Sequence, residues 1–192
     1  MNIYPEKTAI KRWKASRPAR LLSKHCLKSP GYLAWKKKPT FNGPSILDWG
    51  CGRGDDIEHY SSLKYFNTTV GYDPYWNSTL PILKSFEIIT CTYVLNVIPE
   101  KNDRIECVRS LLKYLDPNGD LYISVRTPSE IRRLASKNKW KKYKDGFLTS
   151  KNTFQVALDM GTIVSYIDAA FGHKLKVQII NQKTKGFDMY CF

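Results

Sequence analysis

The sequence lacks several features that would place the protein in a specialised class. None of its apolar runs approaches the ~20 residues of a membrane-spanning helix, and residues 1–7 lack the hydrophobic core of a signal peptide. The five cysteines are scattered, with neither a C-x-x-C pair nor the spacing of a zinc site. These absences predict a cytoplasmic protein with free thiols, no membrane partner and no metal ion.

Acidic residues are scarce, since 17 Asp and Glu stand against 31 Lys and Arg and the net charge is +14. The excess lies on two flanks: residues 1–40 carry +10 and residues 126–151 carry +7, whereas residues 41–125 carry −4. Clustered Lys and Arg are the electrostatic footprint of a polyanionic partner, so nucleic acid is predicted. The alternative is a generally basic, well-solvated surface. The residues expected to contact the substrate are Lys7, Arg12, Arg17, Lys36, Lys37, Arg132 and Arg133.

The central motif is a glycine-rich turn between a predicted strand and a predicted helix. The apolar pair Ile46-Leu47 is typical of a buried strand, and Gly50, Gly52 and Gly54 follow at alternate positions. Glycine lets the backbone turn tightly and lets a ligand approach it closely. The spacing differs from the G-x-G-x-x-G of dinucleotide-binding proteins. Asp48, two residues ahead, would repel a pyrophosphate and favours a cationic ligand.

A second acidic residue lies where a nucleotide ligand would need it. Residues 68–73 form the next predicted strand, which ends at Asp73, 19 residues after Gly54. An acid about 20 residues beyond the glycine turn binds the ribose hydroxyls in nucleotide-binding βαβ units, because a carboxylate accepts both protons. The following residues, Pro74 to Trp76, are placed to wall an adenine ring. The alternative is that Asp73 only caps a turn before Pro74.

The pattern D-x-G-x-G-x-G over Asp48–Gly54 resembles the first motif of class I methyltransferases, which use S-adenosylmethionine. That cofactor carries an ammonium and a sulfonium group. The resemblance implies a Rossmann-like α/β fold, with a mostly parallel sheet of the seven-stranded type and a C-terminal antiparallel hairpin. It also implies that the cofactor lies across the C-terminal edge of the sheet. The residues then expected to bind it are Asp48, Gly50, Cys51, Gly52, Gly54, Asp73, Pro74, Cys91 and Thr92.

A more specific resemblance covers most of the chain. It is to methyltransferases associated with DNA phosphorothioation systems, and it implies the same fold and cofactor without supplying a substrate. The stretches that carry it are Lys7–Arg12, Ser16–Pro18, Leu47–Asp56, Gly71–Tyr75, Tyr93–Ile98, Gly146–Ser150 and Thr153–Gln155.

The acceptor of the methyl group stays open at this point. Displacement at a sulfonium needs mainly positioning, and Tyr93 and Asn96 are the polar residues predicted near the reacting atoms. Residues 92–96 lack the Pro-Pro-aromatic motif of enzymes that methylate amino groups of DNA bases, and Cys91 lacks the preceding proline of cytosine-C5 enzymes. Another position of DNA or RNA is the leading prediction. The alternatives are a small-molecule or protein acceptor, and a cofactor-binding accessory or interference protein without turnover.

The order of apolar patterns predicts one globular unit. Residues 1–40 are expected to form a basic helical extension and residues 41–192 the methyltransferase domain, with a size typical of compact phage or mobile-element proteins. Residues 77–85 are too short for a full third βα unit, which is predicted to be abbreviated. The further expected elements are a strand over 86–91, a helix over 100–115, a turn over 116–120, a strand over 121–125, mixed helix and loop over 126–151, a helix over 160–171 and a terminal hairpin over 175–192.

Overall fold

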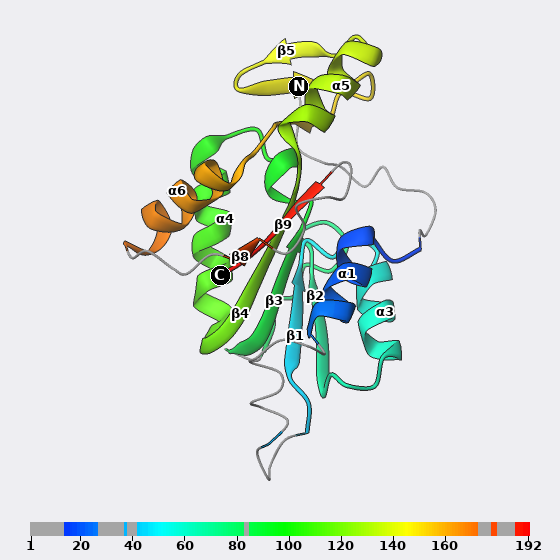
Figure 1. Ribbon diagram of the computed structural model, residues 1–192, viewed down its shortest axis with the longest axis vertical. Helices are drawn as coiled ribbons and strands as arrows, with labels where there is room; N and C mark the ends of the chain where they lie inside the picture. Colours follow the sequence, from blue (N-terminus) through cyan, green and yellow to red (C-terminus); the bar gives the residue numbers. More distant parts are fainter. Residues whose placement is uncertain (1–13, 27–36, 38–41, 83–84, 173–177, 180–186) are drawn as a thin grey trace. The chain divides into compact units, whose positions relative to one another are not determined.

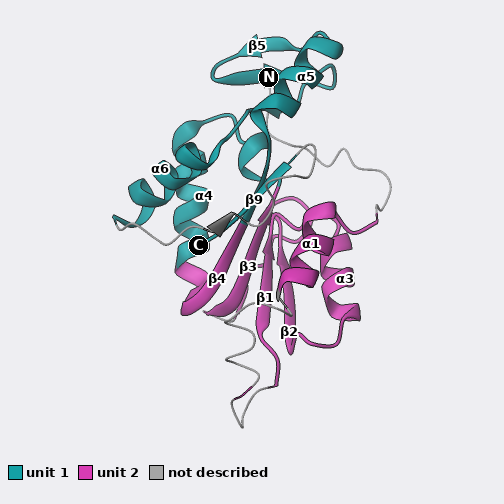
Figure 2. Cartoon of the chain, viewed as in Figure 1, with its two compact units in different colours: residues 1–8, 93–112, 123–192 teal, residues 9–92, 113–122 magenta. Residues whose placement is uncertain are grey.

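The computed structural model describes residues 14–26, 37, 42–82, 85–172, 178–179 and 187–192. The chain forms two compact units (Figure 2). Unit 1 comprises residues 1–8, 93–112 and 123–192, and unit 2 comprises residues 9–92 and 113–122. Strand β4 (Leu115–Arg126) contributes to both. The expected boundary between an extension over 1–40 and a domain over 41–192 stays a prediction.

Unit 2 is built on three neighbouring strands, β2 (Thr68–Tyr72), β1 (Ser45–Trp49) and β3 (Phe86–Thr92). The central strand, β1, runs parallel to both neighbours, and Asp48 lies opposite Gly71 on one side and Thr90 on the other. All five residues of β1 are buried, as expected for a parallel strand that is covered on both faces. The predicted strands over 46–47, 68–73 and 86–91 are confirmed to within a residue or two at each end.

Two helices of unit 2, α1 (Arg17–Cys26) and α3 (Asp55–Ser62), lie side by side (Figure 1). The Ser16 hydroxyl accepts the Ala19 N–H (3.1 Å), which caps the start of α1. The Ser16 N–H and hydroxyl donate to the two Asp56 carboxylate oxygens, at 2.6 and 2.7 Å. These bonds fasten α1 to the first turn of α3, the helix that follows the glycine turn.

Unit 1 contains most of the helical and hairpin structure of the second half. It holds η1 (Leu95–Val97), most of α4 (Lys101–Tyr114), α5 (Pro128–Lys137), β5 (Lys141–Tyr143), β6 (Gly146–Leu148), β7 (Phe154–Gln155), α6 (Met160–Phe171), β8 (Gln178–Ile179) and β9 (Phe187–Cys191). Helix α6 has the predicted bounds, because Asp159 caps its start by accepting the Thr162 N–H (2.9 Å) and Gly172 ends it at φ 75°. No helix in the described part of the chain has both the length and the apolar character that a membrane crossing needs.

The six-stranded sheet has the order β2-β1-β3-β4-β9-β8. Strand β1 is parallel to both neighbours, and β8 and β9 form the expected antiparallel terminal pair, with Gln178 opposite Cys191. The predicted Rossmann-like α/β fold is therefore confirmed. Between Tyr72 and Phe86 the described residues contain no helix or full strand, only a bridge between Asp73 and Asn77. The third βα unit is therefore abbreviated, as predicted. This accounts for a sheet of six strands where the seven-stranded type was expected.

The turn predicted over residues 116–120 is wrong, because β4 begins at Leu115 and includes these residues. Asp116 does make a turn-like contact, accepting the Asn118 N–H at 2.9 Å. However, Gly119 lies so close to β3 that an added Cβ would stand 2.8 Å from the Glu87 carbonyl oxygen. The close approach of a neighbouring strand thus overrides the local turn preference of Asp, Pro, Asn and Gly.

The helix and loop predicted over the basic block 126–151 are confirmed in part, since α5 is the helix but Lys141–Tyr143 and Gly146–Leu148 are strands. Strands β5 and β6 form an antiparallel hairpin in which Lys142 lies opposite Phe147, and β7 extends it into a three-stranded sheet. Strand β5 consists of Lys141, Lys142 and Tyr143, so it lacks the apolar alternation by which a strand is recognised. Residues 141–143 form a strand because they pair with β6, and their own sequence pattern does not indicate it.

The turn of this hairpin is anchored to α4 by two ion pairs. Lys144 pairs with Glu100, and the Asp145 carboxylate accepts from the guanidinium of Arg104. Arg104 is fully buried, and a second of its nitrogens donates to the Ile98 carbonyl at 2.9 Å. A buried guanidinium is stable only when it is paired and hydrogen-bonded. Asp145 therefore stabilises the buried charge of Arg104 and, at the same time, the turn between β5 and β6 to which Asp145 belongs.

Asp145→Ala should lower the free energy of unfolding by about 2 kcal/mol, because it leaves the buried Arg104 charge without its counter-ion. The loss is smaller than for a fully buried pair, since the Asp145 side chain is 47% exposed. Urea denaturation measures it. Glu106→Ala is the matched control, because the pair of Glu106 with Arg109 is exposed on both sides. Equal losses for the two variants would contradict the role given to Arg104.

Candidate functional site

The glycine turn bends the chain back over the end of β2. The N–H groups of Gly50 and Cys51 both donate to the Tyr72 carbonyl, at 2.7 and 3.0 Å. Gly50, Gly52 and Gly54 have φ values of 79°, 54° and 83°, in the left-handed region that favours glycine. The Gly54 N–H closes the turn on the Cys51 carbonyl (2.9 Å), and Gly54 is the N-cap of α3. The alternate spacing of the glycines thus follows from alternate left-handed residues.

A pocket of ≈ 320 Å³ lies at this turn. A Cβ atom built on Gly52 or Gly54 would meet nothing within 4 Å, so bare backbone borders open space there. The Trp76 ring lies beneath the guanidinium of Arg53, 4.3 Å from its centre, and both residues line the pocket. The pocket therefore combines exposed backbone with an aromatic wall. Its lining residues are Cys51, Gly52, Arg53, Gly54, Ile57, Gly71, Trp76 and Asn77.

Asp73 orders two sides of the pocket at once. One carboxylate oxygen accepts the Gly52 N–H at 3.1 Å, and the other accepts the N–H groups of Tyr75 (2.8 Å) and Trp76 (3.0 Å). The turn-capping alternative is thus present in the structure. An ionised carboxylate has about four acceptor positions, so three backbone bonds leave room for a further donor. Binding of a ribose hydroxyl by Asp73 stays a prediction.

Asp48 lies under the glycine turn and is only 2% exposed. The Thr90 hydroxyl donates to it at 2.7 Å. Burial raises the pKa of the Asp48 carboxyl from 3.8 to about 7, and the charges of Asp56 and Asp73 act in the same direction. The first turn of α3 adds the acid Asp55. The ionised carboxyls here disfavour a phosphate and favour a cation, and Asp48 adds to them in its deprotonated form.

Cys51 acts as a packing residue. Burial, together with the charges of Asp48 and Asp73, raises the pKa of its thiol to about 12, so the nucleophilic thiolate is absent near neutral pH. A Cβ atom on Gly71 would lie 2.8 Å from the Cys51 sulfur. Gly71 is therefore required so that the turn can close on β2.

The remaining residues predicted to bind the cofactor lie at the ends of β2 and β3. Pro74 is exposed, Cys91 is fully buried and Thr92 is half-buried. Sequence reasoning missed four residues that line the pocket: Arg53, Ile57, Gly71 and Asn77. Asn77 donates from its side-chain amide to the Gly71 carbonyl at 2.5 Å, a contact that depends on the fold of residues 73–77. Arg53 lies between Gly52 and Gly54 and Ile57 lies just after them, and this closeness to the glycine motif was the available signal.

The two residues predicted near the reacting atoms belong to unit 1. Tyr93 has a φ of 60°, unusual for a residue with a large side chain, and its N–H donates to the Ser124 carbonyl (2.9 Å). Its ring lies beneath the guanidinium of Arg126, 5.4 Å away. Asn96 is 1% exposed and donates to the Gln155 side-chain oxygen at 3.1 Å. Its own amide oxygen has no hydrogen-bond partner in the described part of the chain.

The residues predicted to bind the substrate fall into three groups. Arg17 and Lys37 belong to unit 2, and both are exposed. Arg132 and Arg133 are exposed on α5 in unit 1. Lys7, Arg12 and Lys36 lie outside the described residues. Among the described residues, no group of three or more His, Cys, Asp or Glu side chains is arranged to bind a metal ion.

A family model described as a methyltransferase domain matches residues 10–169. The chain belongs to this family. The match includes the glycine turn, Asp73 and the strand that precedes Tyr93. No functionally curated protein matches the chain.

Solved structures share the fold of this methyltransferase domain at low identity. An S-adenosylmethionine-dependent methyltransferase from Clostridium acetobutylicum is 12% identical, with 90% of this chain and 89% of that one covered and a TM-score of 0.54. The plantazolicin methyltransferase BpumL, solved with S-adenosylhomocysteine (SAH), is 17% identical, with 91% and 84% covered and a TM-score of 0.56. A 1,6-didemethyltoxoflavin-N1-methyltransferase from Burkholderia thailandensis, also with SAH, is 12% identical, with 94% and 92% covered and a TM-score of 0.52.

The buried Asp48 should make the stability of this methyltransferase domain depend on pH. Its pKa is about 7 in the folded state but near 3.8 when unfolded, so the folded state binds more protons between these values. Stability from this group is present at low pH and is lost as pH rises through that window. Asp48→Asn should therefore stabilise the protein more at pH 8 than at pH 5, by about 2–4 kcal/mol. Urea denaturation at both values measures this, and equal effects at pH 5 and pH 8 would contradict it.

Proposed function

We propose that the chain is a methyltransferase that uses S-adenosylmethionine as its methyl donor. The observation that carries the proposal is the pocket at Gly52 and Gly54, where open space borders bare backbone. The charges of Asp48 and Asp73 both act on Cys51 in the lining of this pocket. A ligand with an ammonium and a sulfonium group complements this charge, whereas a dinucleotide would bring phosphates to it. Membership of the methyltransferase-domain family supports the proposal, as do relatives of the same fold solved with SAH.

The residues present fit this cofactor in distinct ways. The backbone at Gly52 and Gly54 allows close contact with its methionine part, and Trp76 offers an aromatic face to adenine. Asp73 has acceptor capacity left for the ribose hydroxyls. Asp48 acts on the ammonium through its charge, directly or through water. When bound, the cofactor supplies a methyl group on a good leaving group, so the protein's contribution is mainly positioning. Tyr93 and Asn96 are proposed to contact the acceptor.

The proposed acceptor is nucleic acid, at a position other than an amino group of a base or cytosine C5. The net charge of +14 and its concentration in residues 1–40 and 126–151 support a polyanionic substrate. A cytoplasmic location and an origin in a phage or mobile element stay predictions from the sequence.

A small-molecule acceptor is the second candidate. It is favoured by two proteins of the same fold, one a plantazolicin methyltransferase and the other a 1,6-didemethyltoxoflavin-N1-methyltransferase. Such a function would make the basic segments irrelevant to turnover. The two candidates therefore differ in whether methyl transfer responds to added polyanion.

Transfer of a radiolabelled methyl group tests the function and separates the two acceptors. The full chain is incubated with labelled S-adenosylmethionine and with genomic DNA, total RNA or a small-molecule extract. Label that is found in the DNA or RNA and is released by nuclease treatment would support the proposal. Label in the small-molecule fraction alone would support the second candidate. A wild-type chain that does not bind S-adenosylmethionine in calorimetry would overturn both.

Trp76→Ala should weaken binding of S-adenosylmethionine about tenfold, because it removes the aromatic wall of the pocket and the partner of Arg53. Tyr75→Ala is the matched control, since this neighbouring ring is 37% exposed and does not line the pocket. Isothermal titration calorimetry measures both. Equal affinities for the two variants would place the adenine elsewhere.

A further inference from the structure

We propose that residues 128–148, comprising α5 and the β5–β6 hairpin, form an arm that binds the phosphodiester backbone of a nucleic-acid duplex. This segment is called the basic arm below. The inference rests on the proposed function, because nucleic acid is the acceptor named there. It adds the element of the fold that holds the acceptor and the chemistry by which it does so.

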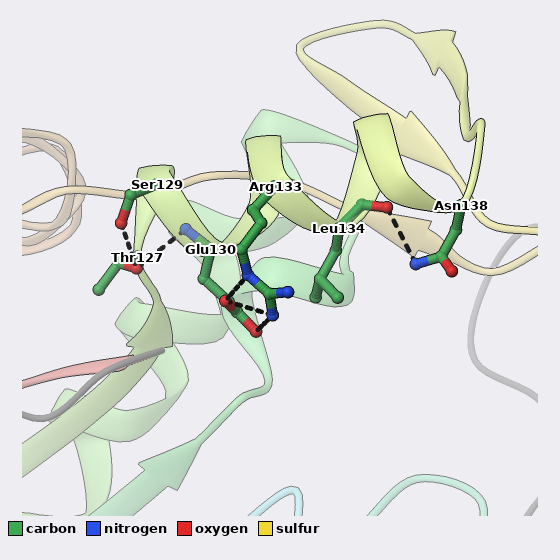
Figure 3. A network of polar contacts seen from close by, with 6 residues as sticks. All are labelled: Thr127, Ser129, Glu130, Arg133, Leu134 and Asn138. Atoms are coloured by element: carbon green, nitrogen blue, oxygen red, sulfur yellow. Dashed lines mark hydrogen bonds and ion pairs between the residues drawn. The ribbon is translucent and has the colours of Figure 1, made fainter.

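The basic arm has a surplus of positive charge that its own acids do not neutralise. It contains seven Lys and Arg residues and two acids, Glu130 and Asp145. Both acids are already engaged: Glu130 pairs with Arg133 (Figure 3), and Asp145 pairs with the buried Arg104. Lys144 in turn pairs with Glu100 outside the arm. The five remaining cations are exposed and form no ion pair with another described residue. They are Arg132, Lys137, Lys139, Lys141 and Lys142.

These cations lie on α5, on the turn that follows it and on β5. Helix α5 is capped at its start by the Thr127 hydroxyl, which accepts the Glu130 N–H at 3.2 Å. It is closed at its end by the Asn138 amide, which donates to the Leu134 carbonyl at 2.9 Å (Figure 3). Its last turn leads directly into the hairpin, since the Trp140 N–H donates to the Ala135 carbonyl at 2.9 Å.

The hairpin is held equally firmly at its turn. Lys144 and Asp145 pair with Glu100 and Arg104 of the segment that begins α4. A Cβ atom on Gly146 would lie 2.4 Å from the Gln155 carbonyl oxygen, so β6 packs against β7 without a gap. Cations fixed on packed elements lose less conformational entropy on binding than cations on a free tail.

The aromatic rings of the hairpin are used internally. Tyr143 packs edge-on against Phe154, with ring centres 6.3 Å apart, and the Lys142 ammonium lies 4.8 Å from the centre of the Phe147 ring. A surface that binds single strands presents open rings on which bases stack. Within the basic arm, the β5–β6 hairpin instead presents ammonium groups, which contact phosphates and carry little sequence information. This favours the backbone of a duplex as the partner.

The decisive experiment measures the salt dependence of duplex binding by the full chain. Fluorescence anisotropy is recorded with a 30-base-pair random-sequence DNA duplex, an RNA duplex and a single strand, each of the same length, at about 0.05 to 0.2 M salt. Lys141→Gln combined with Lys142→Gln removes two charges from the basic arm. Lys101→Gln combined with Lys113→Gln removes two exposed charges from α4 and is the matched control.

The arm variant should bind the duplex about tenfold more weakly than the wild type at about 0.1 M salt. Its slope of log K against log salt concentration should be less steep than that of the wild type by about two. The control should keep the wild-type slope. Comparison of the DNA and RNA duplexes identifies which source of the backbone is preferred. Equal slopes for the two variants would overturn the proposal. So would tighter binding to the single strand, or binding to anionic phosphatidylglycerol vesicles without binding to either duplex.

Binding of S-adenosylmethionine is measured on the same proteins by calorimetry. The arm variant should retain it, because none of its changed residues lines the pocket. If the wild type does not bind S-adenosylmethionine, the proposed function is refuted, but the duplex titration remains valid. Loss of the slope difference alone would refute the basic arm while leaving the cofactor site intact.

Discussion

The placement of β1 between two parallel strands is the constraint on which the site depends. It puts Asp48 opposite both Gly71 and Thr90, so the carboxyl is buried and receives a hydrogen bond from the threonine hydroxyl. It also brings the Tyr72 carbonyl to the N–H groups of Gly50 and Cys51, which turns the chain. The glycine turn is therefore held by the sheet rather than by its own side chains. Gly71 completes the arrangement, since any larger residue would collide with Cys51.

Asp73 extends this order from the strand ends to the pocket wall. Its three backbone bonds connect the turn at Gly52 with the segment that carries Trp76. A carboxylate that already organises two loops is also one that arrives preorganised for a ligand, because its oxygens are fixed before binding. Structural and ligand-binding roles are thus compatible in this residue.

Charge is separated along the chain in a way that suits two ligands of opposite sign. The acids around the glycine turn include Asp48, which is so poorly solvated that its pKa rises to about 7. The basic arm has the reverse composition, and its two acids are consumed by Arg133 and by the buried Arg104. A cationic methyl donor would be repelled by the basic arm, and the proposed polyanionic acceptor would be repelled by the acids around the glycine turn. Because Asp145 and Glu130 are both paired, the basic arm has no unpaired carboxylate that would offset its five unpaired cations.

The sequence by itself determined the fold class, the glycine turn and the acid at the end of β2. These are local patterns: an apolar run before alternate glycines, and an acid at a fixed distance along the chain. Only the tertiary structure decided that Asp116–Asp120 belongs to β4 and that the lysines of β5 form a strand, because both depend on partners distant in sequence. The same holds for the burial of Arg104 and for the internal packing of Tyr143. Such contacts reflect which surfaces meet when the chain folds, and no pattern within a short window of residues encodes them.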